Sequence, residues 1–235
     1  MHLDYPFIWT AFKFLLAAVP LTLLMTILPI LFGFIIALLV TYIRLYKIKV
    51  LAAVAGAYVS FFRSTPAILH VMLIYLGIPV LIIKFGHIFG IGFNANKIPV
   101  FIFVIAALSL TAGAYLSEAV RSGILAVDTG EAEAGYAIGL THGQVIRRIV
   151  LPQALFYALP NFVNLFVGFF HTTSIASIVA VPEITGKAII AASNNYEFLE
   201  AYIAAAIIYW GITILFEWLA HLTDQKLSQL KGGIT

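Results

Sequence analysis

The sequence predicts an all-α integral membrane protein with about five membrane-spanning helices. Hydrophobic residues make up 63% of the chain and charged residues 10%, and the mean hydropathy is +1.06. Soluble domains are typically about 45–50% apolar and about 25% charged. The apolar residues also fall in runs long enough to cross a hydrocarbon core of about 30 Å. A soluble enzyme, a disordered chain and a nucleic-acid-binding protein are therefore excluded, and the lipid bilayer is the expected surroundings.

The apolar runs predict a single transmembrane domain over residues 1–235, with no room for a soluble catalytic domain. The first run contains no charge and should kink near Pro29. The second is too long for one crossing, so we expect residues 50–62 to enter from the interface and 67–83 to cross. A loop should follow over 84–97. The predicted spans are residues 19–42, 52–83, 98–120, 152–181 and 198–219.

The basic residues predict the orientation of the chain, because cytoplasmic loops carry the excess of Lys and Arg. One side of a five-span arrangement holds Arg44, Lys47, Lys49, Arg121, Arg147, Arg148, Lys226 and Lys231. The other side holds Lys13, Lys84, Lys97 and Lys187. This excess puts the N-terminus outside and the loop 125–150 and the C-terminus in the cytoplasm. Residues 1–16 lack the pattern of a cleaved signal peptide, and cysteine is absent, which excludes disulfides and thiolate metal sites.

The loop 125–150 carries two helix-start signals. Asp128 followed by Glu131 is a capping-box pattern, and Gly139 is a suitable helix end. Thr141 followed by Gln144 is a second capping box. We therefore expect two short helices between the third and fourth spans.

Small residues near one face of the first helix, namely Ala132, Gly135 and Gly139, would let another backbone approach closely. Glu133 would offer a negative charge near a helix start to a cation or backbone donor. On these local features alone, the alternative is a well-capped solvated loop without a partner.

A longer pattern connects the loop with a known family. Glu133-Ala134-Gly135 is followed by Gly139 and then by Ile149-x-Leu151-Pro152. This spacing resembles the cytoplasmic EAA signature of ABC-importer permeases, with Gly135 in place of the second alanine. Arg63-Ser64-Thr65-Pro66 is similar to a segment of the polar amino-acid branch of these permeases. So is the run that contains Tyr115, Glu118 and Arg121, and the resemblance covers roughly residues 15–225.

The resemblance implies a non-catalytic subunit of an ATP-driven importer in the cytoplasmic (inner) membrane of a prokaryote, without a cofactor or bound metal. It implies three partners: an ATP-binding cassette subunit, a second permease subunit (an identical or related chain) and an extracytoplasmic solute-binding protein. The sequence contains no Gly-x-x-x-x-Gly-Lys-Ser/Thr phosphate loop, so ATP would be hydrolysed by the partner. The residues expected to couple to it are Glu131, Glu133, Ala134, Gly135, Gly139, Leu151 and Pro152.

Polar residues inside the fourth span are candidates for the solute pathway, because polar groups are costly in hydrocarbon. They are Asn164, His171, Thr172, Thr173 and Ser174. The resembled family usually has Lys-Asp where this chain has His171-Thr172. A site without this charge pair suits a neutral or zwitterionic polar amino acid, and cystine is one candidate. The alternative is that these side chains only pack between helices.

Tyr115, Glu118 and Arg121 follow one another at spacings of three residues, so Glu118 and Arg121 can pair on one helix face. The pair is either a local ion pair or a contact that rearranges when the pathway opens. Arg63 is expected to pair with Glu118 or with a helix end. These four residues are therefore candidates for a gating or a structural role.

Two other classes of function remain for comparison. An intramembrane hydrolase would need a Ser/His pair, two catalytic aspartates or a His-Glu-x-x-His zinc helix. None of the six histidines has the zinc spacing, and no aspartate lies in a predicted span. A self-contained channel or secondary carrier is the remaining alternative, and co-purification with an ATPase would distinguish it from an importer subunit.

Overall fold

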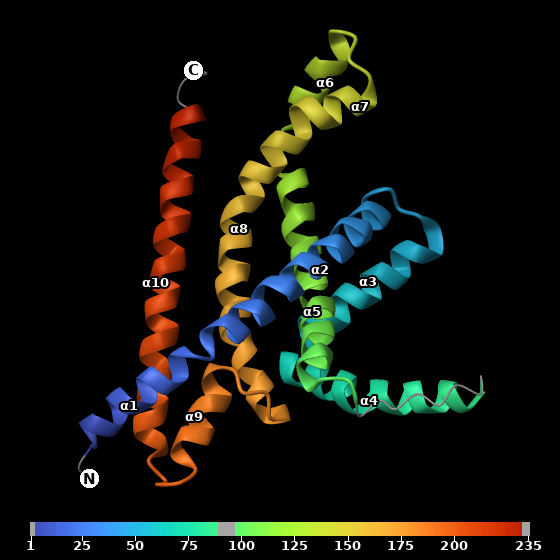
Figure 1. Ribbon diagram of the computed structural model, residues 1–235. Helices are drawn as coiled ribbons and strands as arrows, with labels where there is room; N and C mark the ends of the chain where they lie inside the picture. The colour runs from blue at the N-terminus through green and yellow to red at the C-terminus, as the bar shows by residue number, and fades with distance from the viewer. Residues whose placement is uncertain (1–2, 89–96, 232–235) are drawn as a thin grey trace. The chain divides into compact units, whose positions relative to one another are not determined.

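The computed structural model describes residues 3–88 and 97–231, and this part of the chain is helical apart from short connections. Figure 1 shows the course of the chain. The helices form two compact units: one consists of Met1–Thr26 and Val167–Thr235, the other of Ile27–Phe166.

Within the described residues, five helical segments are long and apolar enough to cross a membrane, which confirms the predicted fold class. They are Val19–Leu45, Ala67–Gly86, Val100–Leu125, His142–Val179 and Phe198–Leu222.

The predicted second span is two helices, α3 (Lys49–Ser64) and α4 (Ala67–Ile88). Thr65 between them is extended, with φ −115° and ψ 148°. Proline disfavours a helical conformation in the residue before it, so Pro66 explains the break. Only α4 is long and apolar enough to cross, as expected for 67–83. The predicted loop 84–97 begins later, because residues 84–88 continue α4; residues 89–96 lie outside the described part.

The helix α5 (Val100–Leu125) is the most buried of the five candidate spans. It contacts α3 and α4, and the Thr41 hydroxyl of α2 (Val19–Leu45) donates to the carbonyl of Ser117 at 3.0 Å. Towards α8 (Leu151–Thr172), a Cβ added to Gly123 would lie 2.5 Å from the Ala154 carbonyl oxygen. Glycine therefore allows these two backbones to approach closely, as small residues do between membrane helices.

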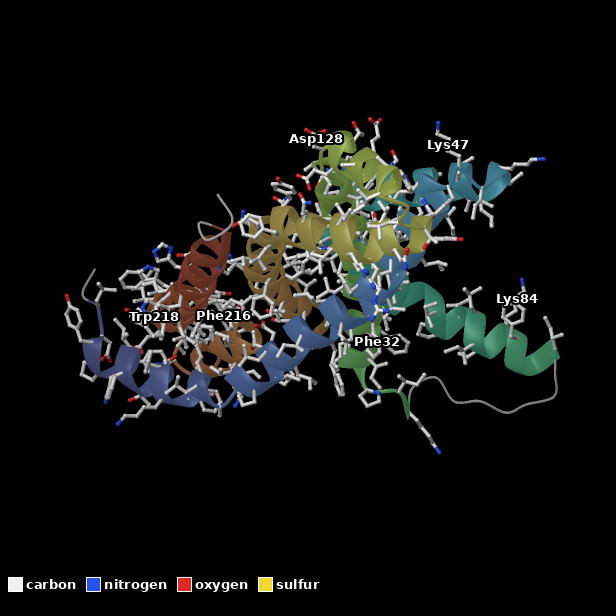
Figure 2. The ribbon with its side chains drawn as sticks, turned by 90° about the horizontal axis from the view of Figure 1, so that it is seen from above. Phe32, Lys47, Lys84, Asp128, Phe216 and Trp218 are labelled. Atoms are coloured by element: carbon white, nitrogen blue, oxygen red, sulfur yellow. The ribbon has the colours of Figure 1, made fainter. Side chains whose placement is uncertain are left out.

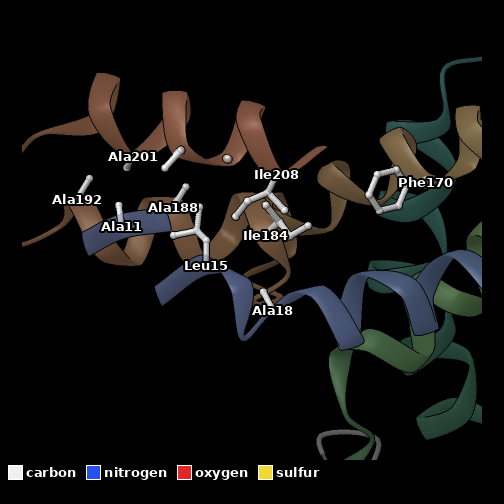
Figure 3. Packing of buried hydrophobic residues seen from close by; sticks show 11 residues of the cluster. Ala11, Leu15, Ala18, Phe170, Ile184, Ala188, Ala192, Ala201 and Ile208 are labelled. Atoms are coloured by element: carbon white, nitrogen blue, oxygen red, sulfur yellow. The ribbon is translucent and has the colours of Figure 1, made fainter. Parts of the chain in front are cut away.

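The other unit is built from α1 (Tyr5–Leu16), α9 (Ile184–Ala192) and α10 (Phe198–Lys231). Figure 3 shows its buried cluster, in which Leu15, Phe170 and Ile184 are fully buried among alanines. Lipid tails are as apolar as leucine, so close van der Waals packing rather than burial from water holds such helices together. The alanines Ala11, Ala18, Ala188, Ala192, Ala201, Ala204 and Ala205 permit this packing.

The helix α8 ends at Thr172, and a 3₁₀ segment, Thr173–Val179, continues the fourth span. The segment ends at Ala180, which has a left-handed backbone with φ 59°. The fourth span therefore ends in a 3₁₀ segment, a tighter helical form that is frequent at the ends of α-helices.

Candidate functional site

The loop 125–150 forms the two predicted short helices, α6 (Thr129–Ala137) and α7 (His142–Val145). A π-helical turn, Ile146–Val150, joins α7 to α8. In Figure 1, α6 and α7 lie beyond the ends of α5 and α8. Thr141 forms its capping box with Gln144, whose side-chain oxygen accepts a hydrogen bond from the Thr141 N–H at 2.8 Å. The second predicted helix start is thus confirmed.

The first helix start differs from the predicted capping box. Asp128, labelled in Figure 2, caps α6 by accepting a hydrogen bond from the Gly130 N–H at 2.8 Å. Glu131 accepts a hydrogen bond from the Gln153 side chain of α8 instead of reaching back to the cap. A partner distant in sequence therefore replaces the local one, and Glu131 links α6 to α8.

Two of the glycines in the loop, Gly135 and Gly139, have different structural roles. A Cβ at Gly135 would lie 2.7 Å from Ile149 Cδ1 and 3.1 Å from Val145 Cγ2. The space beside Gly135 is therefore occupied by side chains of this chain's own following residues. Gly139 has φ 85°, a left-handed backbone that ends α6, as the sequence predicted.

The outward surface of α6 combines a carboxylate with apolar side chains. Glu133, Ala134, Ala137 and Ile138 are exposed, and we call these four residues the α6 face. Ile138 is 78% exposed and lies outside the candidate spans. Leu151 and Pro152, at the start of α8, are exposed as well.

A group of charged side chains meets at α5. Glu118 Oε2 accepts hydrogen bonds from Arg121 Nε at 3.1 Å and Nη2 at 2.9 Å, which is the predicted i, i+3 pair. Glu118 Oε1 accepts a hydrogen bond from Arg44 at the end of α2. Arg63 Nη1 lies 3.9 Å from Oε2, beyond hydrogen-bond distance. We call Arg44, Arg63, Glu118 and Arg121 the Glu118 cluster; it carries three positive charges and one negative charge.

A cavity of about 410 Å³ lies beside this cluster. Its volume falls within the range of small-molecule sites, about 300–1,000 Å³. The Arg63 guanidinium carbon is 5.8 Å from the centre of the Tyr115 ring, a cation–π contact. We call this space the Glu118 cavity. It is lined by Arg63, Tyr115, Glu118, Ala119, Ser122, Asn161, Asn164 and Leu165.

The predicted solute-pathway residues divide between the two units. Asn164 lines the Glu118 cavity, whereas His171 to Ser174 belong to the unit that contains α1. Within that unit, Thr172 donates to the Gly168 carbonyl at 2.7 Å and Thr173 to the Phe170 carbonyl at 2.7 Å. His171 Nε2 lies 2.8 Å from the Thr213 hydroxyl. These contacts agree with the helix-packing alternative for the cluster.

Sequence reasoning missed two residues of these polar networks. Arg44 was counted only as a loop charge, although it is the first basic residue after the first span. Glu183 caps α9, accepting hydrogen bonds from the backbone of Thr185 and Gly186 and from the Tyr209 hydroxyl at 2.8 Å. Burial raises the pKa of Glu183 above its ordinary value. Glutamate is not among the preferred N-cap residues, so no local signal in the sequence pointed to this role.

The fold and the site define a helical membrane protein with a polar cavity and an exposed helical loop. Residues 29–229 match the family model of the binding-protein-dependent transport system inner membrane component, and the chain belongs to this family of ABC-transporter permeases. The family consists of transport components that are not themselves catalytic. The chain is thus a multi-pass inner-membrane protein.

Individual relatives agree with this assignment. The chain is 35% identical to the L-cystine transport system permease protein TcyL of Bacillus subtilis, over 92% of this chain and 87% of TcyL. It is 36% identical to the probable amino-acid permease protein YxeN of the same bacterium, over 97% of both chains. A crystal structure of an amino acid ABC transporter with histidines has a TM-score of 0.83 at 30% identity, over 96% of this chain and 100% of that one. The predicted resemblance to the polar amino-acid branch is confirmed.

Proposed function

We propose that this chain is the membrane-spanning subunit of an ATP-driven importer and that it conducts a neutral, zwitterionic amino acid across the inner membrane. The observation that carries the proposal is the Glu118 cavity, a space of small-molecule size with charged and amide side chains in a strongly apolar chain. An amino-acid zwitterion brings a carboxylate and an ammonium group, and the guanidinium, carboxylate and amide groups of the cavity can bind both.

The charge of the cavity supports a neutral rather than a cationic side chain on the solute. The Glu118 cluster holds Arg44, Arg63 and Arg121 against one carboxylate, so two positive charges are in excess. A lysine or arginine side chain would bring a further cation to this surface and be repelled. The first relative named above is a cystine permease component, which makes cystine a reasonable member of the test panel.

The α6 face supports the proposal of a separate ATP-hydrolysing partner. An exposed isoleucine beside Glu133, on a short helix outside the candidate spans, offers an apolar contact and a negative charge to a groove on another protein. The solute-binding protein and the second permease subunit remain proposals that follow from the family. The self-contained carrier is the competing function, and it predicts no ATPase in the purified complex.

Uptake of labelled amino acids into cells with and without this chain tests the proposal. Neutral polar amino acids, including cystine, should enter in a chain-dependent manner, and azide or ATP depletion should abolish the uptake. The panel should also contain cationic and acidic amino acids. Preferential uptake of lysine or arginine, or uptake that continues without ATP, would overturn the proposed solute class or energy source respectively.

A further inference from the structure

The Glu118 cluster contains one arginine whose hydrogen-bonding capacity is not used by the carboxylate. Arg44 and Arg121 occupy both oxygens of Glu118, one on each. Arg63 Nη1 remains 3.9 Å away and, among the described residues, donates no hydrogen bond. A guanidinium has five N–H donors in a fork that matches a carboxylate.

The position of Arg63 brings these donors to the Glu118 cavity. Arg63 lies in the last turn of α3, just before the break at Thr65, and its side chain is 46% exposed. The Tyr115 ring contacts the guanidinium. A guanidinium that stacks on an aromatic ring keeps its in-plane N–H groups available for an acceptor. Arg63 is therefore held beside the cavity while its N–H donors remain available to a bound solute.

The other groups of the cavity suit the rest of an amino acid. Asn161 and Asn164 lie three residues apart on α8, line the same cavity and, in the described part of the chain, make no side-chain hydrogen bond. Their amide oxygens can accept from an ammonium group and their amide nitrogens can donate to a polar side chain. The excess positive charge of the cluster favours the carboxylate end of the solute at Arg63.

We propose that Arg63 binds the α-carboxylate of the transported solute. This inference rests on the proposed function and deepens it, because it assigns the carboxylate as the group that the permease itself recognises. Solutes that lack a carboxylate should bind weakly even when their side chain is correct.

Equilibrium binding to the detergent-purified permease–ATPase complex, without a solute-binding protein, tests the assignment. The probes are the neutral amino acid that gives the strongest uptake and its α-carboxamide, which replaces the carboxylate by a neutral group. A charge-assisted hydrogen-bond pair contributes about 1.5–3 kcal/mol, which corresponds to roughly a 10- to 100-fold preference for the amino acid over its amide. Arg63→Gln should remove this preference, and Arg63→Lys should restore part of it.

Two matched variants separate binding from folding. Arg44→Gln makes the same substitution at a guanidinium that bonds Glu118 and does not line the cavity, so it should keep the preference even if it lowers thermal stability. Arg148→Gln is an exposed control in the loop 125–150. If Arg63 had only a structural role, Arg63→Gln would lower the affinities for the amino acid and for its amide together and leave their ratio unchanged.

Each outcome decides for or against the assignment. If the wild-type complex binds the amide as tightly as the acid, or Arg63→Gln keeps the wild-type ratio, the assignment of Arg63 is wrong. The same holds if the wild-type complex binds no amino acid. Chain-dependent, ATP-dependent uptake of neutral amino acids alongside any of these results would leave the proposed function standing. Preferential uptake of lysine or arginine, or uptake that continues without ATP, would instead overturn the proposed function itself.

Discussion

Removing the single negative charge of the Glu118 cluster should destabilise the protein strongly. The substitution Glu118→Gln keeps the side-chain shape but leaves Arg44 and Arg121 without their anionic partner. Breaking a fully buried ion pair costs about 3–5 kcal/mol. The three side chains are 17–34% exposed, so water relieves part of this cost. We expect a loss of about 2–4 kcal/mol in the free energy of unfolding, of the order of two charge-assisted hydrogen bonds.

Thermal unfolding of the purified subunit in detergent or nanodiscs, followed by tryptophan fluorescence, measures this loss. For a chain of this length the expected decrease in Tm is roughly 5–15 °C. The double variant Arg44→Gln/Glu118→Gln should be less destabilised than the sum of the single variants, because it removes one of the repelling cations. Glu217→Gln makes the same change at an exposed α10 residue without an ion pair among the described residues, and should leave Tm nearly unchanged.

A Tm for Glu118→Gln within about 1 °C of wild type would refute this reasoning, because the charges would then be solvated independently. Strict additivity in the double variant would refute the coupling of Arg44 to Glu118 even if the single variants were unstable. High salt gives a second check, since screening should reduce the difference between wild type and Glu118→Gln only slightly for partly buried charges.

Four further predictions concern coupling, topology, pH and solute class. Glu133→Lys reverses a charge on the exposed α6 face and should leave the chain inserted while uncoupling ATP hydrolysis from uptake, measured by uptake per ATP hydrolysed. Reporter tags at Met1 and Thr235 should be accessible from opposite faces of the membrane, as the charge distribution predicts. Stability should fall as pH rises from about 4.5 through the raised pKa of Glu183, because the native state holds that proton more tightly than the unfolded chain; Glu183→Gln should remove this part of the pH dependence of Tm. Thr172→Asp supplies an anion where α8 passes into the 3₁₀ part of the fourth span and should shift substrate-stimulated ATPase activity of the reconstituted complex towards cationic amino acids.

A different result contradicts each of these four predictions. Normal coupling in Glu133→Lys would exclude the α6 face from docking, and both tags on one side would contradict five crossings. A slope of stability against pH that is the same in Glu183→Gln and wild type would place the titration elsewhere. If the wild-type complex already responds best to arginine or lysine, the argument from the absent charge at Thr172 is wrong.

The sequence predicted most fully those features that depend on neighbours a few residues away. The Thr141 capping box, the end of α6 at Gly139 and the break before Pro66 are all local, and the structure contains each of them. The Glu118–Arg121 pair is one helical turn long and was predicted for the same reason. Side-chain chemistry and backbone preferences decide these features without reference to the rest of the fold.

The features that sequence reasoning missed depend on residues far apart in the chain. Glu118 also bonds Arg44, 74 residues away, and Glu131 bonds Gln153, 22 residues away. Nothing in the local pattern distinguishes a glutamate that completes a capping box from one that reaches a neighbouring helix. The choice is made by tertiary packing, which brings α8 to α6 and the end of α2 to α5.

At Gly135 the residue type differs from the family signature, and the packing of this chain explains why a small residue is needed there. The resembled signature has alanine there, and the simplest interpretation of any small residue in it is space for a partner. In this chain the space is taken by Ile149 and Val145 from the following helices. The glycine therefore lets α6 lie close to its own hairpin partner, which leaves the α6 face, and Glu133 on it, as the surface free to contact another protein. The recognition of an ATPase would then depend on exposed side chains, whereas the small residues behind them hold the loop in shape.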